Sequence, residues 1–160
     1  MEVRRLREDE VDLLRDVRLR ALGDSPWAYG SSYAREIEHT PERWQWFADQ
    51  RDAVIFVAVE DGAAHGKAGG FYPEPDVVMV WGMWVAPEAR GRGLGRALVE
   101  SVIGWARERG AATVRLEVTD TERARPAAAL YRSLGFVPTG ERETLDSDPS
   151  LETILMTRSP

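Results

Sequence analysis

The sequence predicts a single α/β domain: a mixed, mostly antiparallel sheet with helices on both faces. Its 160 residues suit one domain with one sizeable core, so residues 1–160 are expected to form a single unit. Apolar, β-branched runs alternate with amphipathic segments along the chain. One stretch, Val77 to Thr119, has the order strand–helix–strand and should form a right-handed parallel crossover, whereas the other strands suit antiparallel pairing. The predicted order is β-α-α-β-β-β-α-β-α-β-β.

The N-terminal third is expected to hold one strand and two helices. The opening "EVRRL" is typical of a short strand. Asp9 is expected to cap a helix from about Glu10 to Leu22, and Gly23 is expected to end it. The next residues are rich in turn formers and aromatic side chains and predict a loop with irregular helix. Pro41 then opens a short second helix, because proline is favoured at the first helical position.

The middle of the chain predicts three consecutive strands. Ala53–Glu60 is a β-branched run, and Asp61–Gly62 is a turn signal after which residues 67–72 return as a neighbouring strand. Val77–Val85 is the longest strand candidate. These runs suit a sheet built from hairpins.

The second half predicts two helices and three strands. The first helix begins at about Leu94 and ends at Gly110. Its inward face is expected to hold Leu94, Ala97, Leu98, Ser101, Val102 and Trp105. An alternating strand ends at Thr119, and residues 126–134 form the second helix. Residues 136–145 and 151–158 are expected to close the chain as an antiparallel pair.

Composition narrows the function classes. The chain has no cysteine, which excludes a disulfide framework, a thiolate metal site and a cysteine nucleophile. No signal-peptide core and no membrane-length apolar run is present, so a cytoplasmic protein that does not bind a membrane is expected. The net charge of −6 disfavours nucleic acid as a partner, because phosphate binding needs a basic surface. It suits a cationic substrate, although such a charge also simply aids solubility.

A glycine-rich segment, "RGRGLG" at Arg90–Gly95, lies between a strand and a helix. Unpaired amides and the dipole at a helix start favour anions, and glycine lets a ligand approach the backbone closely. Arg90, Arg92 and Arg96 add positive charge. The segment therefore predicts a pyrophosphate cradle, the alternative being a flexible connector. The missing Gly-Lys-Ser/Thr disfavours a P-loop, and the G-x-G-x-G spacing past the middle of the chain disfavours a dinucleotide fold.

Two motifs carry a resemblance to a known family. "VAPEARGRGLGRAL" at 85–98 resembles the acyl-CoA loop of the GNAT superfamily of N-acetyltransferases, and "AALYRSLGF" at 128–136 resembles that superfamily's Leu-Tyr-x-x-x-Gly-Phe element. The resemblance implies an acyl-CoA N-acyltransferase-like fold in which the two parallel strands splay apart around acetyl-CoA, the co-substrate. No metal is implied, and many members pair as homodimers.

The resemblance also implies which residues bind the cofactor. The end of the longest strand would pair its backbone with the pantetheine arm, as an added strand does. The amides of the glycine loop would hold the pyrophosphate. The cofactor-binding residues are then Met83, Trp84, Val85, Arg90, Gly91, Arg92, Gly93, Leu94, Gly95 and Arg96. The Trp84 side chain either lines the cleft or belongs to the core.

The catalytic residues are implied in the same way. Tyr131 matches the family tyrosine that protonates the departing CoA thiolate, and the Val85 N–H matches the usual oxyanion donor. The family's strand glutamate is missing, so Glu117 is the first candidate for the general base and Glu74 and Asp76 follow. Each of these could instead be a solvated surface charge.

A second departure from the family concerns cofactor binding. Ala124 stands where many members have an asparagine that contacts the pantetheine or phosphate arm, and the chain has no asparagine at all. Glu122 or Arg125 could take its place, or the contact could be absent.

These observations predict an N-acetyltransferase that acts by direct transfer, since a chain without cysteine is unsuited to a covalent acyl-enzyme. The acceptor is expected to be a small, cationic primary amine, because aromatic and acidic residues share the N-terminal region. These are Trp27, Tyr29, Tyr33, Trp44, Trp46 and Phe47 with Asp24, Glu36 and Glu38. The alternatives are an acyl-CoA-binding or regulatory domain with little transfer activity, and a nucleotide-binding protein.

Overall fold

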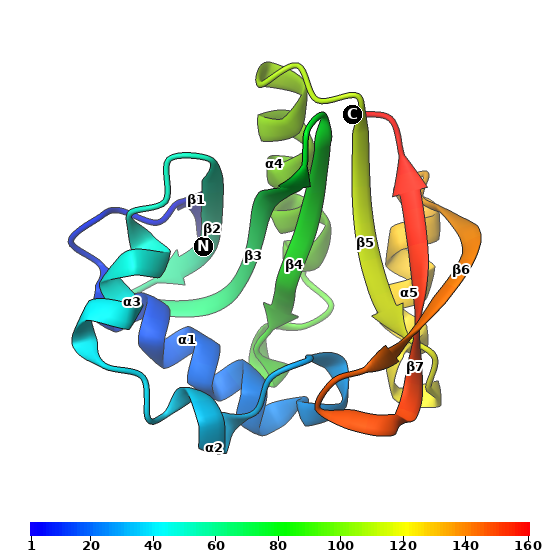
Figure 1. The fold of residues 1–160 in the computed structure, drawn as a ribbon. Coiled ribbons are helices and arrows are strands. Elements are labelled where there is room, and N and C mark those ends of the chain that lie inside the picture. The colour runs from blue at the N-terminus through cyan, green and yellow to red at the C-terminus, as the bar shows by residue number, and fades with distance from the viewer.

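A seven-stranded sheet forms the centre of the molecule in the computed structural model, which describes residues 1–160 (Figure 1). The strand order is β1-β2-β3-β4-β5-β7-β6. The strands are β1 (Glu2–Arg5), β2 (Ala53–Glu60), β3 (Ala63–Glu74), β4 (Val77–Val85), β5 (Thr113–Thr119), β6 (Val137–Leu145) and β7 (Asp148–Arg158). Only β4 and β5 are parallel neighbours, which confirms the predicted mixed sheet.

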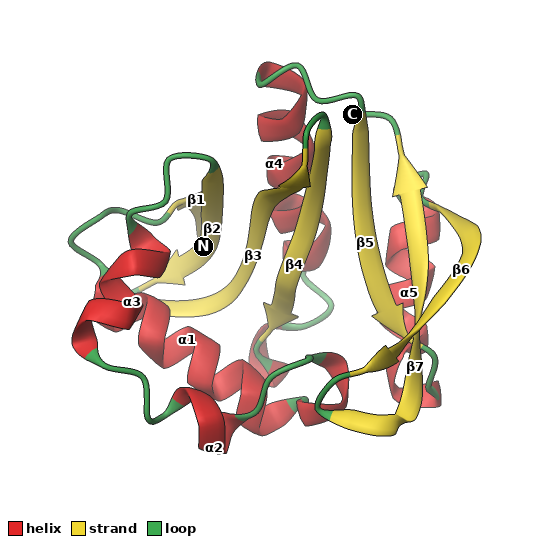
Figure 2. Ribbon diagram, in the orientation of Figure 1, coloured by secondary structure: helices red, strands yellow, loops and turns green.

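Helices cover both faces of this sheet (Figure 2). They are α1 (Val11–Asp24), α2 (Tyr33–Glu36), α3 (Pro41–Ala48), α4 (Leu94–Glu108) and α5 (Arg125–Ser133). Three 3₁₀ turns, η1 (Pro26–Ala28), η2 (Pro87–Ala89) and η3 (Glu122–Ala124), complete the elements. α4 and α5 lie behind the sheet in this view, with α1 on the other side. The predicted order is confirmed, with α2 as a single extra turn.

The predicted bounds of α1 are wrong at both ends. The residue before the helix is Glu10 rather than Asp9, and Glu10 makes no cap bond to the helix. Its carboxylate instead accepts two hydrogen bonds from Arg4, at 2.9 and 2.7 Å, and one from the Arg7 N–H. The bonds from Arg4 outweigh burial and lower the pKa of Glu10 to about 2. At the other end the helix continues through Gly23, because the Ser25 N–H still bonds to the Ala21 carbonyl.

The core lies between the sheet and its helices. On α4, Leu94, Leu98, Val102 and Trp105 are buried as predicted, and so are Val99, Ile103 and Ala106. Ala97 and Ser101 are only half-buried. The buried stripe is thus wider and rotated toward Val99, as expected for a helix covering several strands. No helix is both long and apolar enough to cross a bilayer.

The parallel pair separates soon after it forms. Register partners exist only between Val77–Met79 of β4 and Thr113–Arg115 of β5. Beyond these residues β5 continues with β7 alone, and the far half of β4 keeps only β3 as a neighbour. The predicted splay of the parallel strands is therefore present, and it leaves one edge of β4 unpaired.

Candidate active site

A cleft of about 690 Å³ opens where β4 and β5 separate. Its walls come from segments distant in sequence: η1, the end of β4, the glycine loop, β5, the start of α5 and the β6–β7 turn. Ten of the predicted site residues line it: Met83, Trp84, Val85, Arg90, Gly91, Gly93, Leu94, Gly95, Glu117 and Tyr131. The fold therefore gathers most of the predicted site in one place.

The glycine loop forms the floor of a cradle at the start of α4. Gly91 and Gly93 have φ values of +76° and +78°, in the left-handed region that favours glycine, and Gly93 directly precedes the helix. A Cβ built on either residue meets no atom within 4 Å, so the space above the backbone is open. Open space above free helix-start amides suits the oxygens of a pyrophosphate. The residues present fit acetyl-CoA in this respect.

Arg90 is tied to both strand and helix. Its Nε donates to the Val85 carbonyl at 2.9 Å and its guanidinium pairs with Asp24, the last residue of α1, at 2.7 Å. Asp24 also accepts from Trp84 Nε1 at 3.0 Å and Ser25 Oγ at 2.7 Å. Burial alone would raise the pKa of Asp24, but these hydrogen bonds outweigh it and lower the pKa. Asp24, the last residue of α1, thus anchors the glycine loop to this helix.

Two predicted cofactor arginines do not line the cleft. Arg92 lies 3.9 Å from the Glu60 carboxylate, and Arg96 donates to Ser133 Oγ at 2.6 Å. Arg123 in η3 does line it, and sequence reasoning overlooked this residue. Its only signal was a position next to Ala124, which lines the cleft where the family asparagine is expected. The suggested substitutes, Glu122 and Arg125, lie 3.8 Å from each other with exposed side chains outside the cleft.

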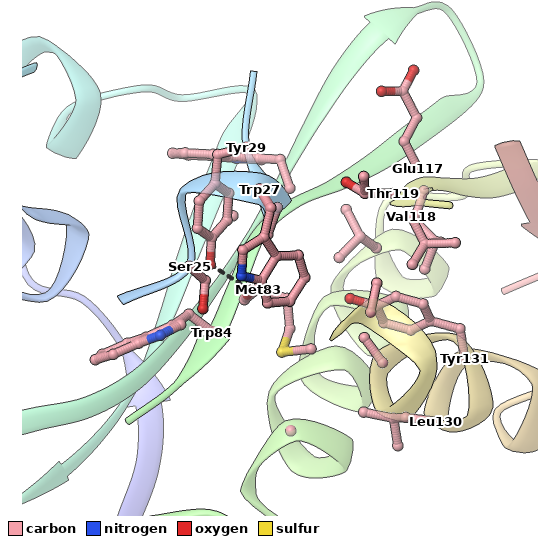
Figure 3. A pocket seen from close by; sticks show the side chains of 18 of the residues that line it. Ser25, Trp27, Tyr29, Met83, Trp84, Glu117, Val118, Thr119, Leu130 and Tyr131 are labelled. Atoms are coloured by element: carbon pink, nitrogen blue, oxygen red, sulfur yellow. Dashed lines mark hydrogen bonds between the residues drawn. The ribbon is translucent and has the colours of Figure 1, made fainter. Parts of the chain in front are cut away.

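The end of β4 presents its backbone to the cleft. Tyr29 donates its hydroxyl to the Met83 carbonyl at 3.0 Å, and Figure 3 shows this bond beside Trp27. Because each carbonyl oxygen has two lone pairs, the bonds to Met83 and Val85 leave an acceptor position for a ligand. The Trp84 side chain points away from Tyr131 and is 4% exposed, so its backbone is the part best placed to meet a ligand (Figure 3).

Tyr131 enters the cleft from α5. Its ring is buried against Phe136, and its hydroxyl makes no hydrogen bond within the protein. Burial raises the pKa of the Tyr131 phenol above its usual range, which keeps it protonated at neutral pH. A protonated hydroxyl without a partner in the protein can donate its proton to a bound ligand.

Glu117 lies on β5, on the opposite side of the cleft opening from Tyr29 (Figure 3). Partial burial and the neighbouring Glu143 and Asp146 carboxyl groups raise the pKa of Glu117 to about 7. Such a group exchanges its proton at neutral pH, as a general base must. The other two candidates are wrong: Glu74 pairs with Arg115 at 3.6 Å and Asp76 precedes β4, both at the closed end of the parallel pair and outside the cleft.

The N-terminal aromatic residues divide into two groups. Trp27 and Tyr29 line the cleft, whereas Trp44, Trp46 and Phe47 pack with one another beside Trp81. Of the acids expected with them, Glu36 is buried in a two-bond pair with Arg18, at 2.9 and 2.8 Å. The acids that do face the cleft are Glu143 and Asp146, at the β6–β7 turn. Sequence reasoning missed both, because nothing in the local pattern distinguishes them from surface charges.

Comparisons with known proteins agree with this geometry. The acetyltransferase (GNAT) family matches residues 19–136. The mycothiol acetyltransferase of Thermomonospora curvata is 36% identical over 133 residues, 80% of this chain and 40% of that protein. The streptothricin acetyltransferase of Streptomyces lavendulae is 39% identical over 90 residues, 55% of this chain and 47% of that protein. The chain thus spans less than half the length of either relative.

A solved structure shares the whole fold. A Salmonella typhimurium protein solved with acetyl-CoA has a TM-score of 0.81 at 20% identity, covering 99% of this chain and 93% of that one. The family match covers most of the chain, and both the cradle and the splayed strands are present. The chain belongs to the acetyltransferase (GNAT) family and is an N-acetyltransferase.

Proposed function

We propose that this enzyme transfers the acetyl group of acetyl-CoA to a primary amine of a small, cationic acceptor, by direct attack in a ternary complex. The observation that carries the proposal is that Glu117 of β5 and Tyr131 of α5 line the same cleft, across from the free edge of β4. Direct attack needs a base for the amine and an acid for the thiolate, and these two side chains supply them.

The cofactor would lie along β4 and over the glycine loop. Backbone groups of Met83 and Val85 would pair with the pantetheine arm, and the amides of Gly91 to Gly95 would hold the pyrophosphate. Arg90 and Arg123 both line the cleft and would add charge-assisted bonds to phosphate. Acetyl-CoA supplies an activated thioester carbonyl, and the Val85 N–H would stabilise the negative charge that develops on its oxygen.

Glu117 would receive the proton of the incoming amine. A free alkylamine has a pKa near 10.4, so only about one molecule in a thousand is neutral at pH 7. A carboxylate whose pKa is raised to about 7 is a stronger base than an ordinary glutamate. Tyr131, kept protonated by burial, would give its proton to the departing sulfur.

The charge of the cleft supports a cationic acceptor. Glu143 and Asp146 join Glu117 at the acceptor end, and Trp27 and Tyr29 supply aromatic faces there. Thr119 also lines this end, is 5% exposed, and has a hydroxyl without a partner in the protein. The relatives' names include a mycothiol and a streptothricin acetyltransferase, so the family alone does not fix the acceptor.

The test is turnover of acetyl-CoA with a panel of amines of increasing charge. Diamines should give a higher kcat/KM than amino alcohols of equal length, which carry one positive charge fewer at neutral pH. Glu143→Gln and Asp146→Asn should each raise KM for diamines severalfold. Glu141→Gln is the matched control, because it removes the same charge from β6 outside the cleft. Tight CoA binding without turnover of any amine would instead favour an acyl-CoA-binding domain.

A further inference from the structure

The strand that carries the proposed oxyanion donor contains a bulge. Lys67 of β3 faces Trp84 of β4, and Gly69 faces Trp81, so three steps along β4 oppose two along β3. The extra residue is accommodated at Gly82, whose φ of +61° lies in the left-handed region. The bulge lies between Met79, the last residue of β4 that pairs with β5, and the segment Met83 to Val85, and therefore sets the direction of that segment.

One side chain of the neighbouring strand β3 bonds to this bulge. Lys67 Nζ donates to the Gly82 carbonyl at 2.8 Å, across fifteen residues of sequence. A Cβ placed on Gly82 would lie 2.3 Å from that nitrogen, so the amine fills the space that only glycine leaves open. Lys67 is the only lysine of the chain, and it is 0% exposed.

The surroundings of Lys67 disfavour a positive charge. Burial lowers the pKa of Lys67 well below its usual range, and the Arg18 guanidinium lowers it further. The nearest carboxylate, Glu36, opposes this shift but is already engaged by both of its bonds to Arg18. The Trp81 ring centroid lies 4.4 Å from Nζ, so the amine lies against an aromatic face rather than in solvent. Burying an amine without a counterion of its own costs free energy that an apolar side chain in the same space would not. Packing alone therefore does not account for Lys67.

We propose that Lys67 is a positioning residue for acetyl transfer: its hydrogen bond to the Gly82 carbonyl fixes the β4 bulge and so aims the Val85 N–H and the strand edge at the thioester. The inference deepens the proposed function and rests on it. The cofactor loop has its own anchor in the Arg90–Asp24 pair, at 2.7 Å. Loss of the Lys67 bond should therefore affect the chemical step more than the binding of CoA.

The first experiment compares wild type with Lys67→Met, which keeps the unbranched apolar stem of the side chain but removes the terminal amine. We expect kcat to fall on the order of tenfold to hundredfold, because small misplacements of catalytic groups have effects of this size. The Kd for CoA, measured by calorimetry, should change by less than about threefold. The melting temperature is measured alongside, because the substitution removes a buried amine but also leaves the Gly82 carbonyl without its donor.

A chemical rescue separates positioning from packing. The chain has no cysteine, so Lys67→Cys can be alkylated at one site in denaturant and refolded. Bromoethylamine restores an amine at the lysine position, and bromopropane gives a side chain of the same length without a donor. We expect the aminoethyl form to recover kcat and the propyl form to resemble Lys67→Met. Wild type carried through the same treatment controls for refolding.

A measurement without turnover checks the contact itself. Lysine labelled with ¹³C and ¹⁵N at the side-chain end gives one signal in this chain, and its pH titration should show an amine pKa below the usual lysine range. A pH titration like that of a free lysine, equal kcat for both alkylated forms, or undiminished kcat in Lys67→Met would each overturn the inference. If wild type turns over no amine at all, the proposed function fails instead, and the labelled signal still tests the buried amine.

Discussion

Tyr131 combines a buried ring with an unpaired hydroxyl at the cleft, and this combination gives the most direct test of mechanism. Tyr131→Phe keeps the ring contact with Phe136 and removes only the proton donor. We expect kcat to fall about 10²- to 10⁴-fold with the KM for acetyl-CoA nearly unchanged, because general-acid catalysis contributes on that scale. Steady-state release of CoA measures both constants. An unchanged kcat would show that the leaving thiolate takes its proton from elsewhere.

Glu117 predicts a pH dependence. Its carboxyl group must be ionised to accept a proton, so kcat/KM should rise as pH increases through about 7. In Glu117→Gln that rise should disappear, leaving only the shallower dependence due to the amine itself. A pH–rate series with one diamine measures this, and an unaltered profile in the variant would exclude Glu117 as the base.

The same raised pKa has a consequence for stability. The folded state binds this proton more tightly than the unfolded chain, whose glutamate titrates near 4.5. The stabilising contribution is therefore complete below pH 4.5 and is lost as pH rises through about 7. The free energy of unfolding of Glu117→Gln relative to wild type should increase from pH 5 to pH 8. Urea unfolding of both proteins at these two pH values measures this difference.

At the scale of the element, α4 offers a matched pair of glycines. Gly93 at its start and Gly110 after its end have φ values of +78° and +74°, and a Cβ on either meets no atom within 4 Å. Alanine at each position should destabilise the fold by a similar amount, on the order of 1 kcal/mol, because the backbone strain is the same. Only Gly93→Ala should also weaken acetyl-CoA binding, since its Cβ enters the cradle.

The measurement for this pair is the melting temperature of each variant with and without acetyl-CoA. Gly110→Ala should keep the full ligand-induced increase, and Gly93→Ala should lose most of it. Equal increases in both variants would mean that the pyrophosphate lies elsewhere.

At the scale of the whole molecule, acetyl-CoA should link the two halves of the open sheet. The cleft walls come from both sides of the β4–β5 separation, so the ligand site exists only in the folded state. At one hundred times its Kd it should add about 2.7 kcal/mol to the free energy of unfolding. For a chain of this size that is an increase of roughly 5–10 °C in melting temperature. NAD and ATP at the same concentration should give no increase; an equal increase with either would contradict acyl-CoA specificity.

Much of the architecture followed from local pattern. The bounds of β2, β4 and β5 agree with their β-branched or alternating runs, and the glycine loop with the helix after it predicted the cradle. These features depend on side-chain periodicity and on glycine's backbone freedom, both of which are properties of neighbouring residues. The ends of α1 were mispredicted because Glu10 is engaged by Arg4 of β1, and a contact between two elements leaves no local signature.

By itself, the sequence determined the element order and the position of the glycine loop, and its resemblance to the GNAT superfamily pointed to Tyr131. Each depends on patterns within short segments of the chain. Only the tertiary structure decided the rest. It placed Glu143 and Asp146 beside Glu117, tied Arg90 to Asp24, and buried Lys67 behind the β4 bulge. The physical reason is that charge–charge and hydrogen-bond energies depend on distance and burial. Residues far apart in the chain come close together, in a shared low-dielectric environment, only when the sheet and its helices are packed.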